Sequence, residues 1–68
     1  MPQMGTVKFY NQDKGYGVIA LEDGSEAFVF HSHVRGGRRA ILQEGQAVSL
    51  DAIDGPKGRE ARNVEPLG

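Results

Sequence analysis

The chain has no cysteine and no apolar run long enough to cross a membrane, which takes about 20 residues. Without cysteine it has neither disulfides nor thiolate metal sites, and this fits a reducing compartment, so we expect a cytoplasmic protein. The first residues, Met1–Met4, carry neither the basic nor the apolar segment of a signal peptide, so we expect no export and no membrane partner.

Helical periodicity is also missing, and ten glycines indicate tight turns instead. Sixty-eight residues make a single domain, 1–68, and a chain of this size buries only about 60% of its unfolded surface. The 38% apolar and 25% charged content is typical of a folded domain and not of a disordered chain.

The net charge of −1 does not by itself suggest a polyanion as partner. The charges, however, come in blocks of alternating sign, with basic residues gathered at 35–39 and 57–62. Two interpretations stay open: the blocks are solvated loops, or the fold collects the basic ones on a positive face.

Short segments rich in β-forming residues alternate with turns that contain glycine, asparagine or aspartate. The expected strands are 6–10, 16–21, 26–31, 47–53 and 59–64. Gly15 is expected to take a positive φ in the first turn, and residues 33–34 to form one turn of 3₁₀ helix. Five short strands without a helix predict an all-β fold, a small closed antiparallel barrel.

Side-chain alternation divides the second and third strands into an aliphatic and an aromatic face. The aliphatic face comprises Ile19, Leu21 and Val29. The aromatic face comprises Tyr16, Phe28 and Phe30. We expect the aliphatic face to form the core, which leaves three exposed aromatic rings that need a functional reason. In the alternative arrangement the aromatic rings form the core and the aliphatic side chains are exposed.

Residues for catalysis are scarce. His31 and His33 would share one face of a strand, but two imidazoles without a third ligand make a poor metal site. The segment 15–17 resembles part of a phosphate loop, yet no helix and no Lys-Ser/Thr pair follow it. We therefore expect no enzyme, no catalytic residue, no metal and no cofactor.

Basic and aromatic residues are interleaved near the N-terminus. Lys8 precedes Phe9 and Tyr10, and Lys14 precedes Tyr16 by two residues. Proteins bind single-stranded nucleic acid with aromatic rings for the bases and cations for the backbone. This interleaving therefore favours single-stranded RNA or DNA as the partner.

These segments resemble the bacterial cold-shock proteins. Residues 14–19 are similar to the family's first ribonucleoprotein motif, Lys-Gly-Phe-Gly-Phe-Ile, and residues 28–32 to its second, Val-Phe-Val-His-Phe-Ser. Residues 5–11, 42–48 and 61–64 resemble its opening, loop and closing motifs. The match runs without a gap from Gly5 to about Val64.

The resemblance implies a single cold-shock domain with a five-stranded oligonucleotide/oligosaccharide-binding (OB) barrel. It also implies binding of single-stranded RNA and DNA, with roles as RNA chaperone and as regulator of transcription and translation. We expect a monomer, with a strand-exchanged dimer as the alternative. The ligand-facing positions carried over are Lys8, Phe9, Tyr10, Lys14, Tyr16, Phe28, Phe30, His31 and Lys57.

Departures from the family pattern alter the expected binding surface. Phe9 replaces a tryptophan, and Val18 replaces the second aromatic residue of the first motif. Arg39 stands where a loop phenylalanine is common, and we count it among the candidate contacts. The stacking surface is therefore expected to be smaller than the family's, and the loop more basic.

The order Phe30-His31 is reversed relative to the family. With regular alternation, which we favour, Phe30 becomes a base platform beside Phe28 and His31 lies at the barrel rim. With a bulge at the strand end, His31 would turn to the ligand and Phe30 to the core. A rival function uses the same rings: a small barrel that binds a peptide, with Tyr16, Phe28 and Phe30 as its hot spot.

Overall fold

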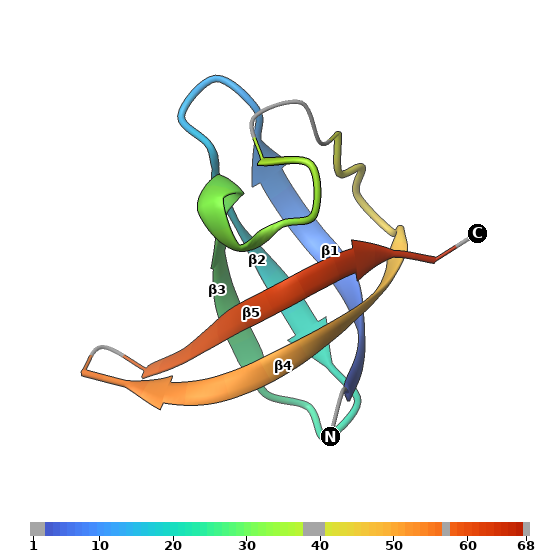
Figure 1. Ribbon diagram of the computed structural model, residues 1–68. Coiled ribbons are helices and arrows are strands. Elements are labelled where there is room, and N and C mark those ends of the chain that lie inside the picture. The colour runs from blue at the N-terminus through green and yellow to red at the C-terminus, as the bar shows by residue number, and fades with distance from the viewer. Residues whose placement is uncertain (1–2, 38–40, 57, 68) are drawn as a thin grey trace.

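The computed structural model describes residues 3–37, 41–56 and 58–67, which form five strands and one short 3₁₀ helix (Figure 1). In chain order these elements are β1 (Gln3–Asn11), β2 (Tyr16–Leu21), β3 (Glu26–Phe30), η1 (His31–His33), β4 (Ala47–Gly55) and β5 (Gly58–Pro66). All five predicted strands are present. No helix within these ranges is long and apolar enough to cross a membrane.

The element boundaries differ from the predicted ones where pairing continues beyond the apolar segments. Strand β1 begins three residues earlier than expected, because Gln3 still lies opposite Leu50 of β4. Strands β4 and β5 extend to their hairpin, where Asp54 lies opposite Arg59. The 3₁₀ helix covers His31–His33, so it starts two residues before the predicted position and ends β3 at Phe30.

The strands close into a barrel in the order β1-β2-β3-β5-β4, with β4 pairing back onto β1. The five-stranded OB barrel is therefore confirmed. Four of its contacts are antiparallel, but β3 and β5 run parallel, with Phe28 opposite Glu60 (Figure 1). Strand direction cannot alternate at every contact around a ring with an odd number of strands. The predicted antiparallel pairing therefore holds at four contacts, and the contact between β3 and β5 is the exception.

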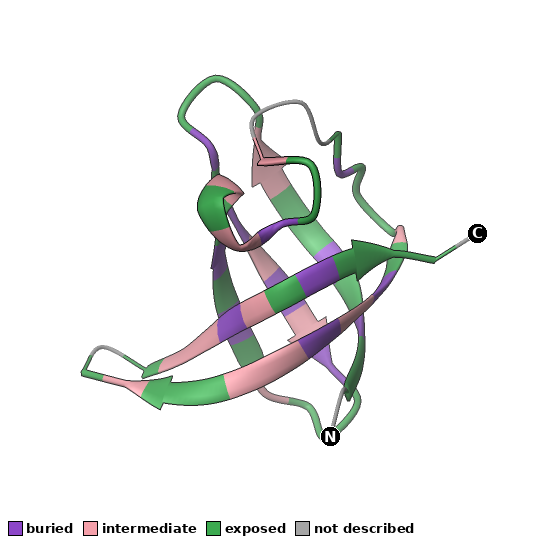
Figure 2. Ribbon diagram, viewed as in Figure 1, coloured by how far each residue is buried: buried purple, intermediate pink, exposed green. Residues whose placement is uncertain are grey.

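The barrel interior is aliphatic, as expected from the alternation in β2 and β3. The buried apolar residues are Val7, Ile19, Leu21, Ala27, Val29, Val34, Leu42, Val48, Leu50, Ala61 and Val64. Along β2 and β3, buried positions alternate with exposed or half-buried ones (Figure 2). No aromatic residue belongs to the buried set of the described chain, so the alternative with an aromatic core was wrong.

Two described residues between β3 and β4 belong to the hydrophobic core. Val34 and Leu42, which were not predicted to be core residues, are both buried there. Val34 forms a parallel bridge with Val64 of β5, and the Arg35 N–H donates to the Val64 carbonyl at 2.9 Å. The backbone of η1 and its following turn is thereby attached to β5.

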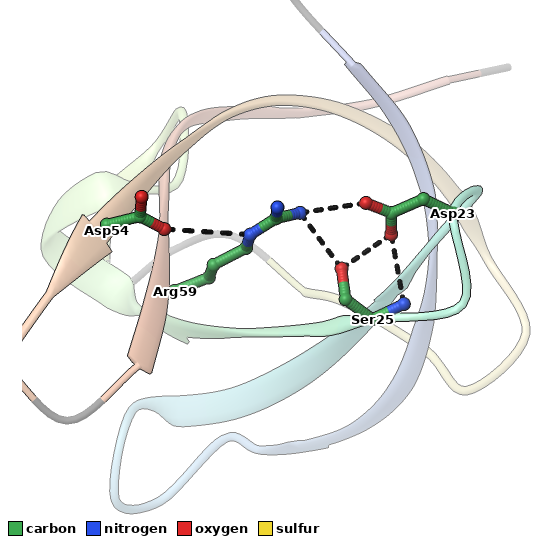
Figure 3. Close-up of polar contacts among 4 residues, drawn as sticks. All are labelled: Asp23, Ser25, Asp54 and Arg59. Carbon is green, nitrogen blue, oxygen red and sulfur yellow. Dashed lines mark hydrogen bonds and ion pairs between the residues drawn. The ribbon is translucent and has the colours of Figure 1, made fainter.

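A polar network joins the β2–β3 turn to the β4–β5 hairpin (Figure 3). Arg59 donates from Nη1 to Asp23 Oδ2 at 2.9 Å and to Ser25 Oγ at 3.0 Å. Its Nε lies 3.6 Å from Asp54 Oδ1. Asp23 also accepts from the hydroxyl and the backbone N–H of Ser25. These bonds, the Ser25 hydroxyl first, lower the pKa of Asp23 to about 2.

The lowered pKa of Asp23 makes part of the stability depend on pH. The charged form is stabilised in the folded state, so this contribution is present above pH 4 and is lost between about pH 4 and pH 2. We expect Asp23→Asn to lower the melting temperature at pH 7 and to narrow its difference from the parent protein towards pH 2. Glu22→Gln, in the same turn, is the control for loss of one exposed charge. A melting-temperature difference that does not change with pH would contradict this role of Asp23.

Candidate nucleic-acid interface

Four aromatic side chains lie exposed on the outer surface of β1, β2 and β3. Phe9 of β1 thus joins the three rings expected from β2 and β3, and from here on the aromatic face means all four. Its members are Phe9 (39% exposed), Tyr16 (36%), Phe28 (48%) and Phe30 (46%). Four large rings exposed on one side of so small a protein are unfavourable in water, and exposed apolar patches of this kind mark interaction sites. The exposure predicted for Tyr16, Phe28 and Phe30 is confirmed.

Strand register brings these rings together in two rows. In the first row Phe9, Val18 and Phe28 lie on adjacent strands, directly opposite one another. In the second row Tyr16 lies opposite Phe30. The rings of Phe9 and Tyr16 connect the rows in an edge-to-face contact, with centroids 6.3 Å apart and planes at 85°. This edge-to-face geometry is favourable for a pair of aromatic rings.

Val18 leaves a gap in the first row. It lies between Phe9 and Phe28, at the position where the family motif has an aromatic residue, and it is half-buried. The first row therefore has two aromatic rings separated by an aliphatic side chain.

A β-bulge in β1 decides which neighbouring side chains reach the aromatic face. Val7 pairs with Ile19 and Phe9 with Val18, so Lys8 is an extra residue without a partner on β2. Beyond the bulge the alternation shifts by one residue, which leaves both Lys8 and Phe9 exposed.

Tyr10 lies apart from the aromatic face because of the same shift. The Tyr10 side chain is half-buried and packs against the core. Its ring lies so close to Gly17 that a Cβ added to this glycine would be 2.8 Å from Tyr10 Cδ1. Burial raises the pKa of the Tyr10 phenol. Although the sequence placed Tyr10 with Phe9 among the ligand-facing residues, the structure separates the two.

Phe30 and His31 adopt the regular arrangement. The β2–β3 ladder has no register shift, and Phe30 is exposed beside Tyr16, so the bulged alternative was wrong. The His31 N–H donates to the Gly15 carbonyl at 2.8 Å, and its ring lies so close to Gly15 that a side chain there would overlap it. Gly15 also has a φ of +75°, as predicted. His31 thus holds the β1–β2 turn at the rim of the aromatic face.

The basic residues predicted to contact the nucleic acid differ in their surroundings. Lys8 forms an ion pair with Glu26, and both side chains are at least half exposed to solvent. Lys14 lies in the exposed β1–β2 turn, where its backbone N–H donates to Asn11 Oδ1 at 2.9 Å. Among the described residues its ammonium group has no ion pair. The predicted contacts Arg39 and Lys57 lie outside the described residues.

An open groove of about 560 Å³ lies beside the aromatic face. Its lining residues are Tyr16, Phe28, Phe30, Pro56, Gly58 and Glu60. This volume is within the range of small-molecule sites, roughly 300–1,000 Å³. The sequence did not point to Glu60. Alternation from the buried Ala61 would have placed it outside, but not beside Phe28.

The two histidines do not share a strand face as expected, because both lie in η1. Throughout residues 3–37, 41–56 and 58–67, no three His, Asp or Glu side chains gather as the ligands of a metal ion would.

Comparison with known proteins agrees with this geometry. The family model of the "cold-shock" DNA-binding domain matches residues 3–67. The chain is 43% identical to cold shock protein CspB of Bacillus caldolyticus over 65 residues, which cover 96% of this chain and 98% of that protein. It is 48% identical to the major cold shock protein of Micrococcus luteus over 65 residues, which cover 94% and 97%.

A solved structure of Drosophila Unr CSD456 has the same fold, with a TM-score of 0.78 at 16% sequence identity. The match covers all of this chain and 27% of the Drosophila chain. The motifs, the barrel and these matches together show that this protein belongs to the cold-shock domain family, a family of nucleic-acid-binding proteins.

Proposed function

We propose that this protein binds single-stranded RNA and DNA by stacking bases on the aromatic face and by contacting the backbone with basic side chains. The observation that carries the proposal is the exposure of four aromatic rings side by side, while aliphatic residues fill the core. Stacking on an aromatic ring contributes about 1–3 kcal/mol per base and tolerates any base, because every base has a π-face.

We further propose that it acts in the cytoplasm as an RNA chaperone and as a regulator of transcription and translation, in line with its relatives' names as cold shock proteins. A protein that binds many sequences through stacking is suited to keeping RNA single-stranded. The closed barrel pairs the strand edges that would otherwise recruit a second chain, and this supports a monomer as the binding unit.

The proposal is tested by comparing single strands with duplexes. A duplex hides the faces of its bases, so we expect a labelled single-stranded hexanucleotide of mixed sequence to bind at least ~10-fold more tightly than the matching duplex. Fluorescence anisotropy measures both affinities. Similar affinities for RNA and DNA are expected, because stacking does not require the 2′-hydroxyl. Equal affinity for the duplex would contradict stacking, and no affinity for either form would favour a peptide partner.

A substitution at Phe30 is expected to change the binding affinity without changing the stability. Its ring is 46% exposed, so we expect Phe30→Ala to leave the midpoint of chemical denaturation nearly unchanged. The same variant should lose about 1–3 kcal/mol of binding free energy, because one base platform is removed. Phe30→Tyr keeps the ring and is the matched control. A large loss of stability in Phe30→Ala would show that the ring belongs to the core.

Lys14 provides a test of backbone contact. The slope of log affinity against log salt changes by about 0.7 for each phosphate contact with a single strand. We expect Lys14→Gln to flatten the slope by about that amount. Arg35→Gln is the control, because Arg35 is bonded to Glu65 at 3.0 Å instead of lying beside the aromatic face. Equal slopes in the parent protein and Lys14→Gln would show that Lys14 does not contact the bound nucleic acid.

A further inference from the structure

A carboxylate lies in the groove beside the aromatic face. Glu60 lines this groove together with Tyr16, Phe28 and Phe30, and it is the one charged side chain among the described residues of the lining. Because a carboxylate repels the phosphates of a nucleic acid, it is unexpected in a site for backbone contact. Its position suggests that it acts on the bases instead.

Strand pairing places Glu60 next to a base platform. It lies directly opposite Phe28 across the parallel β3–β5 contact, and Ile53 of β4 flanks it on the other side. Neighbouring strands are about 4.8 Å apart, so a base stacked on Phe28 has the Glu60 side chain at its edge.

The oxygens of Glu60 are available to a ligand. Two other glutamates, Glu26 and Glu65, are held by Lys8 and Arg35. For Glu60 the described chain shows neither an ion pair nor a side-chain hydrogen bond. The carboxylate lies against the backbone of Gly55, where any added Cβ would overlap its Oε2. Gly55 therefore leaves the space in which this carboxylate sits.

The chemistry of the carboxylate favours one kind of base. An ionised carboxylate only accepts hydrogen bonds. The Watson–Crick edge of guanine presents two adjacent donors, N1–H and the N2 amino group, which match its two oxygens. Uracil and thymine present one N–H between two carbonyl oxygens, whose lone pairs face the carboxylate unfavourably. We propose that Glu60 selects guanine over uracil or thymine at the base position on Phe28, an inference that rests on the proposed function.

The test compares an all-uracil hexanucleotide with variants in which guanine replaces one uracil at each position in turn. We expect one such variant to bind the parent protein about tenfold more tightly, as a bidentate contact between side chain and base does. In Glu60→Gln the amide both donates and accepts, so the preference should fall to about twofold or less. Glu44→Gln removes the same charge at an exposed turn and should keep the preference.

A second measurement uses the parent protein alone and so does not depend on the folding of the variant. Inosine lacks the N2 amino group and should lose most of the preference, whereas 7-deazaguanine is altered on the opposite edge and should keep it. Binding without a guanine preference, or an equal preference in Glu60→Gln, would overturn this inference alone. Failure to bind any hexanucleotide would instead overturn the proposed function, and this inference with it.

Discussion

The narrow interior of a short five-stranded barrel is the constraint on which the other features of the protein depend. Such an interior is filled by side chains and leaves room for aliphatic residues such as Ile19, Val29 and Leu50. Since side chains alternate along a strand, each buried aliphatic residue places its neighbours outside. The aromatic rings of β2 and β3 are therefore exposed for the same reason that the core is well packed. The core and the proposed binding surface thus occupy opposite faces of the same strands.

Closure of the barrel determines which residues surround the aromatic side chains. With five strands one contact must be parallel, and here it joins β3 to β5. This contact brings the β4–β5 hairpin to the edge of the aromatic face, where Pro56, Gly58 and Glu60 complete the groove. The groove thus joins Phe28 and Phe30 to residues that are about thirty positions away in the chain.

In the proposed complex, charged side chains contact the phosphates and the aromatic rings contact the bases. In the proposed binding mode the exposed Lys14 contacts a phosphate, while Lys8 is paired with Glu26 and must exchange that partner to bind one. Phosphate contacts position a nucleic acid, and contacts to base edges carry sequence information. A net charge of −1 is compatible with such a surface, because binding depends on where the cations lie and not on their total.

Local sequence patterns determined the two faces of the central strands and the position of the first turn. A period of two assigned the inner and outer faces of β2 and β3, including exposed Phe30, and glycine at position 15 marked a turn with positive φ. Only the tertiary structure decided that β3 and β5 pair in parallel, that the bulge at Lys8 turns Phe9 outward and Tyr10 toward the core, and that Glu60 lies beside Phe28. Alternation is a property of each strand by itself. Register between strands is set by how all five pack around one core, and no single segment encodes it.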